Sequence, residues 1–184
     1  MSKLISVLYQ EHKGLKKLLS LMKEKLVRLQ REESIDYSLL EDAVLYIESF
    51  VDGYHHPKED IIYQYIIDHD LDNNRVFQHK LDDHDDIKKI TLDLKQVLHS
   101  INLDIIVSRN SVINELEAFI HVSNNHLNDE EHNTFPLIER LLNDEDWLNI
   151  AQLMPEYCED PLFGRNLKED YLDLSHRLAN YEVC

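Results

Sequence analysis

The sequence contains few residues that interrupt helices and few cysteines. Only 3 glycines and 4 prolines occur among 184 residues, which disfavours a turn-rich β fold and favours long helices. The 2 cysteines, Cys158 and Cys184, lie near the end of the chain without metal-site spacing, so we expect free thiols in a reducing compartment. No apolar run approaches the ~18 residues that span a bilayer, and the N-terminal residues lack the apolar core of a signal peptide. We therefore expect a cytoplasmic protein.

Basic side chains are also scarce. The chain carries 19 Lys and Arg against 36 Asp and Glu, which gives a formal net charge of −17. A nucleic-acid-binding protein usually presents a basic face, and an anionic membrane surface attracts basic segments. Here Lys16-Lys17 and Lys88-Lys89 are isolated pairs. We expect neither a nucleic-acid partner nor a membrane partner.

Apolar residues recur at alternating spacings of three and four along most of the chain, which is the period of an amphipathic helix. The pattern predicts helices over residues 4–31, 37–67, 75–100 and 105–142. Four long helices joined by short links are typical of an up-down-up-down bundle. We therefore expect an all-α fold in which residues 1–143 form the four-helix bundle. Residues 144–184 are expected to form a helical C-terminal extension that packs on it.

The chain holds 11 histidines, and the positions of four of them repeat between its two halves. A single His-x-x-x-acid pair is a weak signal, because roughly two would arise by chance in this composition. The repeat is stronger. His12 and His84 are 72 positions apart in segments that align without gaps, and His55 and His126 are 71 positions apart. Each half therefore reads histidine, about 43 residues, then His-x-x-x-Glu.

Six polar residues of this repeat fall on the apolar seams of the predicted helices. They are His12, His55, Glu59, His84, His126 and Glu130. Burying imidazoles and carboxylates without compensation would cost several kcal/mol per charge, and a pair of cations would supply the missing countercharge. Imidazole and carboxylate suit Fe, Mn or Zn. The two glutamates can bridge two metals, and six ligands leave positions open for dioxygen, peroxide, nitric oxide or water.

Two alternatives stay open from the residues alone. The neighbouring pair His56/Asp60 competes with His55/Glu59 for the same place, and a metal-free bundle with buried polar residues would also produce the pattern. Pro57 predicts a local break at the site, because a proline within a helix removes one hydrogen bond and clashes with the carbonyl four residues earlier. The histidines expected on the surface are His69, His79, His99, His121, His132 and His176.

Taken in order, these residues resemble the hemerythrin-like family, also called the HHE cation-binding domain. The matching elements are Glu11-His12, His55-His56-Pro57-Lys58-Glu59-Asp60, Asp83-His84 and His126-Leu127-Asn128-Asp129-Glu130-Glu131, followed by Phe135-Pro136. The resemblance covers residues 1–143. It implies a four-helix bundle with two iron ions joined by an oxo or hydroxo bridge, for which Mn or Zn can substitute. It also implies that the six seam residues are the metal ligands.

Oxygen-carrying hemerythrins have a fifth histidine one turn before the counterpart of His84, where this chain has Lys80. The resemblance is therefore closer to hemerythrin-like proteins with four histidines, for which peroxide decomposition, nitric oxide chemistry and sensing are suggested. It implies a di-iron protein that binds or reacts with dioxygen, peroxide or nitric oxide. The alternatives are an iron- or oxygen-sensing regulatory module and an iron store or donor. A protein partner or a homodimer is compatible with each of these roles.

Overall fold

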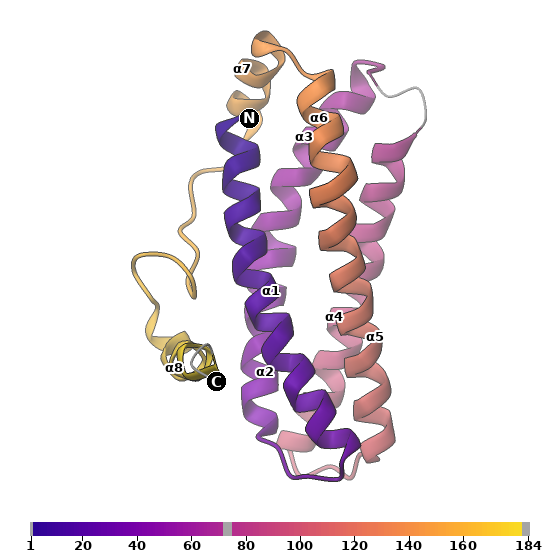
Figure 1. Ribbon diagram of the computed structural model, residues 1–184, viewed down its shortest axis with the longest axis vertical. Helices are drawn as coiled ribbons and strands as arrows, with labels where there is room; N and C mark the ends of the chain where they lie inside the picture. Colours follow the sequence, from indigo (N-terminus) through magenta and orange to yellow (C-terminus); the bar gives the residue numbers. More distant parts are fainter. Residues whose placement is uncertain (1, 72–74, 182–184) are drawn as a thin grey trace.

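The computed structural model describes residues 2–71 and 75–181, and within these residues every regular element is helical, as expected for an all-α bundle. The longer helical segments run along the long axis of the molecule (Figure 1) and form four rods. The first rod is α1 (Lys3–Gln30) and the third is α4 (Val76–Asn102). The second comprises α2 (Tyr37–Tyr46), η1 (Ile47–His55) and α3 (His56–Asp68), and the fourth comprises α5 (Arg109–Asp129), η2 (Glu130–Thr134) and α6 (Phe135–Leu141).

Side-chain caps set where the rods begin. The Ser2 hydroxyl accepts a hydrogen bond from a backbone N–H in the first turn of α1, and the Asp36 carboxylate caps α2 in the same way. The Ser108 hydroxyl accepts a hydrogen bond from the N–H of Ser111, so α5 begins at Arg109. The predicted start of the fourth helix at residue 105 was therefore wrong, because the residues before this cap belong to the link from α4.

Each of the two composite rods contains a stretch of π-helix just before a proline. η1 ends at His55, two residues before Pro57, and η2 ends at Thr134, two residues before Pro136. A proline has no N–H to donate and its ring crowds the carbonyl four residues back. The regular α-helical hydrogen bonds cannot continue through it, and π turns of this kind are frequent at functional sites. The break predicted at Pro57 is therefore a widened turn within a continuous rod.

The apolar core is divided into two clusters along the bundle. Leu8 of α1 and Ile62 of α3 belong to one cluster, whereas Leu15 of α1 and Val51 of η1 belong to the other. On each of these rods, the segment between the two clusters carries the repeated histidines and glutamates. The two apolar clusters therefore enclose a polar layer near the middle of the bundle.

The residues after the bundle form α7 (Asp144–Leu153), η3 (Glu169–Tyr171) and α8 (Leu172–Tyr181). They lie along the outside of the bundle, and α8 contacts α1 and α2 (Figure 1). Leu162 and Leu174 are buried in the larger core cluster. The ring of Phe163 packs over Gly14, where an added Cβ would lie 2.6 Å from the nearest ring carbon. The absence of a side chain at this glycine lets the C-terminal segment approach α1 closely.

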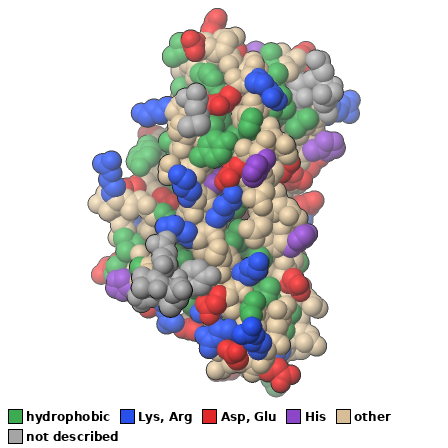
Figure 2. All heavy atoms as spheres, in the orientation of Figure 1, with side chains coloured by type: hydrophobic (Ala, Val, Ile, Leu, Met, Phe, Trp, Pro, Cys, Tyr) green, Lys and Arg blue, Asp and Glu red, His purple; other side chains and the backbone are tan. Residues whose placement is uncertain are grey.

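Charged side chains of both signs are scattered over the face shown in Figure 2. On the face shown in Figure 2, Lys and Arg side chains lie among acidic and apolar side chains and form no continuous basic surface. None of the helices in the described ranges is both long and apolar enough to cross a bilayer. Within the described residues Cys158 is an exposed free thiol. Cys184, the other cysteine of the predicted pair of free thiols, lies outside them.

Candidate metal centre

Seven buried side chains converge in the polar layer between the two apolar clusters. They are the six predicted ligands together with His56, and none of them is more than 6% exposed. They come from α1 (His12), η1 (His55), α3 (His56 and Glu59), α4 (His84), α5 (His126) and η2 (Glu130). The six histidines expected on the surface are all exposed. All four rods therefore contribute to one site.

The side chains form two donor groups that share one glutamate. The first group comprises His56, Glu59, His84 and His126, and the second comprises His12, His55 and Glu59. Within each group, the donor atoms all lie within 4.8 Å of one another. Donor atoms this close can ligate a common ion, so Glu59 is placed to bridge two ions.

Glu130 lies between the same two groups. Its Oε2 is 3.2 Å from Nε2 of His126 and 3.5 Å from Nε2 of His12, and its Oε1 is 3.5 Å from Nε2 of His84. Glu59 shows the same arrangement, with Oε1 at 3.5 Å from Nε2 of His12 and Oε2 at 3.6 Å from Nε2 of His84. Two carboxylates that each reach both groups are suited to bridge two cations.

An acidic residue faces the outer nitrogen of four of the five imidazoles. The distances from Nδ1 to a carboxylate oxygen are 3.3 Å for His12 and Glu131, 2.7 Å for His55 and Glu11, 3.2 Å for His56 and Asp52, and 2.6 Å for His84 and Asp60. A carboxylate in this position favours the tautomer that carries its proton on Nδ1, and it leaves Nε2 free for a metal. Acidic residues outside the donor layer therefore orient the imidazole rings that face into it.

The sequence pattern predicts Asp60 only as part of an alternative ligand pair, and it gives no role to the carboxylates of the other outer acids. Asp60 lies outside both donor groups, and its side chain is 39% exposed. Of the alternative pair His56/Asp60, the structure brings only His56 into a donor group. A signal for the missed residues exists in the sequence. Glu11 and Glu131 are adjacent to predicted ligands, and Asp52 precedes His56 by one helical turn.

The inward-facing atoms of the layer have no hydrogen-bond partner within the described residues. They are Nε2 of His12, His55, His84 and His126, both carboxylate oxygens of Glu59, and Oε2 of Glu130. An ionised group buried without a partner costs several kcal/mol, and native proteins rarely keep one unless water or an ion satisfies it. The donors are nitrogen and oxygen atoms without thiolate, which suits iron, manganese or zinc. The residues therefore fit a pair of metal ions.

The pKa values of the titratable groups in the layer are shifted in different directions. Burial raises the pKa of Glu59, and the nearby Glu130 carboxylate raises it further. Burial opposes the charged form of His84, but the hydrogen bond with Asp60 and the neighbouring carboxylates raise its pKa to about 10. Burial lowers the pKa of His126 to about 3. His84 therefore carries a proton at neutral pH, and a cation that binds this imidazole must displace it.

His56 supplies a fifth imidazole, and Lys80 does not enter either donor group. Lys80 occupies the position of the fifth histidine of oxygen-carrying hemerythrins, but its Nζ pairs with Oδ2 of Asp83 at 2.7 Å and with Oδ2 of Asp129 at 2.9 Å. The ring of His56 stacks on that of His84, with the ring centroids 4.2 Å apart. Both members of the adjacent His-His pair therefore reach the layer.

Tyr63 forms a direct hydrogen bond to the centre. Its hydroxyl donates to Oε1 of Glu130 at 2.6 Å, and both side chains are fully buried. A hydrogen bond to an ionised acceptor is stronger than one between neutral groups. Tyr63 therefore fixes the orientation of Glu130 and leaves Oε2 of this carboxylate facing the histidines.

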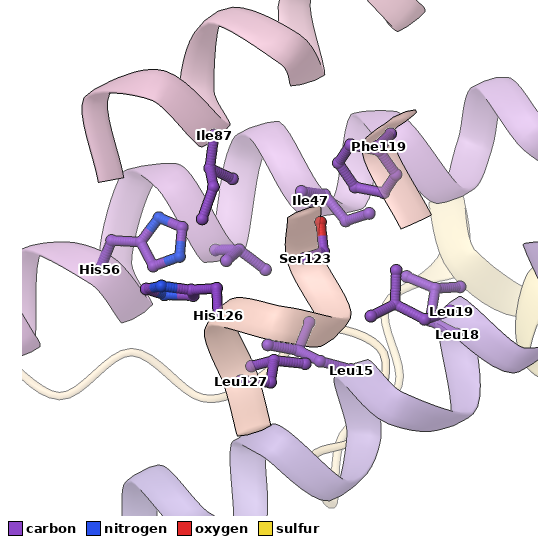
Figure 3. A pocket seen from close by; sticks show the side chains of 11 residues that line it. Leu15, Leu18, Leu19, Ile47, His56, Ile87, Phe119, Ser123, His126 and Leu127 are labelled. Atoms are coloured by element: carbon purple, nitrogen blue, oxygen red, sulfur yellow. The ribbon is translucent and has the colours of Figure 1, made fainter. Parts of the chain in front are cut away.

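A small apolar cavity of about 30 Å³ adjoins the layer. His56 and His126 form one end of it, and Leu18, Leu19 and Phe119 form the other (Figure 3). A cavity of this size holds about one water-sized molecule. The arrangement therefore offers a place for one small molecule beside two donor imidazoles.

The fold and the site together define a helical-bundle protein with a buried imidazole–carboxylate centre suited to metal ions. The sequence profile described as the hemerythrin HHE cation binding domain matches residues 3–138. The chain therefore belongs to this family, which confirms the resemblance seen in the sequence. No curated protein and no solved structure matched the chain. Family membership and the buried His/Glu cluster together assign cation binding to this protein.

We expect cation binding to release a proton from His84. At about pH 8 this imidazole is protonated, because the pH lies below its pKa of about 10. The lowered pKa of His126 keeps that imidazole neutral at the same pH. Addition of Zn²⁺ to the metal-free protein in weakly buffered solution should therefore release about one proton per chain or more, measured with a pH indicator.

The matched variants for this measurement change one acid each. Asp60→Asn removes the carboxylate that raises the pKa of His84, so proton release at about pH 8 should fall. Asp68→Asn alters an exposed acid on the same helix and should behave as the wild type. Equal proton release from Asp60→Asn and from the wild type would contradict the assignment.

Proposed function

We propose that this protein holds a non-haem di-iron centre and uses it to bind or react with dioxygen, peroxide or nitric oxide. The observation that carries the proposal is the set of buried imidazoles and carboxylates whose inward atoms lack partners. One iron would be held by His56, His84 and His126, the other by His12 and His55, with Glu59 and Glu130 shared between them. The group with two imidazoles has fewer ligands, which favours open coordination positions there.

Bound iron would supply coordination of the small molecule and electron exchange between iron(II) and iron(III). The chain's own residues provide the positioning. Glu131, Glu11 and Asp60 are hydrogen-bonded to Nδ1 of His12, His55 and His84, and the Tyr63 hydroxyl holds Glu130. The Asp52 carboxylate lies 3.2 Å from Nδ1 of His56. These contacts fix the donor atoms before a ligand arrives, so little reorganisation is needed when it binds.

The adjoining cavity supports a small, uncharged ligand. Apart from His56, His126 and Ser123, its walls are apolar side chains. A volume of about 30 Å³ excludes most organic substrates. An apolar wall also disfavours ions and holds water weakly. Dioxygen, nitric oxide and hydrogen peroxide match these limits in size and charge.

A spectroscopic titration tests this function. Metal-free protein is loaded anaerobically with iron(II) and then exposed to nitric oxide, dioxygen or peroxide. We expect new near-ultraviolet and visible absorption bands in proportion to the bound iron. The absence of any iron-dependent spectral change with all three ligands would contradict the proposal.

A variant in the cavity wall tests whether the small molecule binds in this cavity. Ser123→Leu enlarges a side chain in the cavity wall without altering a donor residue. It should weaken nitric oxide binding about tenfold or more, at unchanged iron content, because the space beside His126 is filled. Ser20→Leu on the exposed face of α1 is the matched control and should bind nitric oxide like the wild type.

A sensing role is favoured by contacts that join the centre to the C-terminal segment. Oε2 of Glu11 faces Nδ1 of His55 and also accepts a hydrogen bond of 2.7 Å from Nζ of Lys58. The Lys58 ammonium lies 4.4 Å from the centre of the Tyr54 ring, and the Tyr54 hydroxyl accepts a hydrogen bond from the N–H of Cys158. A change at His55 on metal binding therefore has a path of direct contacts to residue 158.

Amide hydrogen exchange tests the sensing role. Metal loading of the wild type should change exchange at Cys158, because that N–H is held by Tyr54. Glu11→Gln removes the charge that holds Lys58 and should abolish the response. Glu48→Gln, which breaks the ion pair with Lys95, is the control and should keep it. Exchange at Cys158 that is independent of metal in the wild type would rule out this readout.

A further inference from the structure

A surface groove lies between α4 and α5 on one side of the metal centre. Its volume is about 430 Å³, and acidic side chains together with one lysine line it. These charged residues are Asp83, Asp86 and Asp129 with Lys80. Further inside, the groove is lined by Ile87 and His126. Both of these also line the buried cavity beside the donor layer, so they separate the groove from the cavity.

His126 joins the groove to the donor atoms. Its side chain is 4% exposed, and neither of its ring nitrogens has a hydrogen-bond partner within the described residues. The other four imidazoles of the layer each have an outer carboxylate against Nδ1. The one donor imidazole without such a carboxylate is thus the one that lines the groove, where a cation would first meet the layer.

The charges at the mouth of the groove favour cations. Three carboxylates stand against one ammonium, and Asp83 and Asp129 are 48% and 41% exposed. Asp86 pairs with Lys89, but both of these side chains are about 70% exposed, so solvent screens that pair strongly. A cleft lined by one sign of charge concentrates ions of the opposite sign and raises their association rate.

Lys80 connects α4 and α5 through ion pairs with one acid on each helix. Its Nζ lies 2.7 Å from Asp83 on α4 and 2.9 Å from Asp129 on α5. The lysine side chain is only 10% exposed, so it pairs with the two acids from within the groove. In this position it neutralises two carboxylates that would otherwise attract a cation, and it lines the same groove as His126.

We propose that this groove is the route by which a divalent cation reaches the centre, with Lys80 as the residue that limits its passage. The cation is attracted by the three acids, passes beside Ile87 and meets His126 as its first donor. Lys80 slows loading because its ammonium repels the incoming ion and ties α4 to α5. The inference rests on the proposed metal centre but not on any reaction with dioxygen, peroxide or nitric oxide.

Stopped-flow uptake of Zn²⁺ by the metal-free full-length protein tests the charge of the route. Lys80→Met should raise the bimolecular uptake rate about threefold or more at low ionic strength, because Asp83 and Asp129 lose their countercharge. The gain should shrink as salt screens the acids. Lys95→Met removes the same charge from the same helix at a pair with Glu48, away from the groove, and should leave the rate unchanged.

A second variant tests the path itself without altering its charge. Val122 is half-buried and lines the groove one turn before His126. Val122→Trp should slow Zn²⁺ uptake about threefold or more while leaving the final stoichiometry unchanged, because the indole fills the groove. Leu92→Trp, at a 45% exposed position on α4, is the size-matched control and should load like the wild type.

The outcomes separate this inference from the metal centre. Faster uptake in Lys80→Met and slower uptake in Val122→Trp, with both controls unchanged, support the route. Wild-type rates in both groove variants, with full final binding, overturn the route and leave the metal centre intact. No saturable Zn²⁺ binding by the wild type overturns the route together with the centre.

Discussion

The structure depends on one energetic constraint, which is the countercharge that its buried donor atoms require. Imidazoles and carboxylates lie between two apolar clusters, and their inward atoms lack partners within the described residues. Burial of such groups costs several kcal/mol each unless they are paired. The pKa of His84 is raised and that of His126 is lowered, because the buried layer can carry only some of these groups in their charged forms. Bound cations would supply the countercharge that these groups lack.

The surroundings of the centre determine how the donors are presented. Carboxylates outside the layer orient the rings, Tyr63 fixes Glu130, and prolines impose the π turns that precede α3 and α6. These hydrogen bonds and π turns come from different rods, so the geometry of the centre requires the assembled bundle. The C-terminal segment contacts the same assembly, since the N–H of Cys158 donates a hydrogen bond to the Tyr54 hydroxyl.

The helical period and the internal repeat were sufficient to predict the bundle and the six seam residues that the structure brings together. They could not decide between His55 and His56, because neighbours on a regular α-helix point about 100° apart and only one should face the core. The π turn that ends at His55 changes this register, and both imidazoles reach the layer. The outer acids were missed because one acid beside a histidine is common in so acidic a chain. The start of α5 depended on the Ser108 cap rather than on apolar periodicity.

Anaerobic titration of the metal-free protein with iron(II), combined with denaturant unfolding, tests the central claim most directly. The account predicts saturation at about two cations per chain, together with an unfolding free energy that rises with free metal concentration. The carboxylates and imidazoles of the layer then acquire the partners that they otherwise lack. A chain that takes up no iron, and that unfolds at the same denaturant concentration with and without it, would contradict the account.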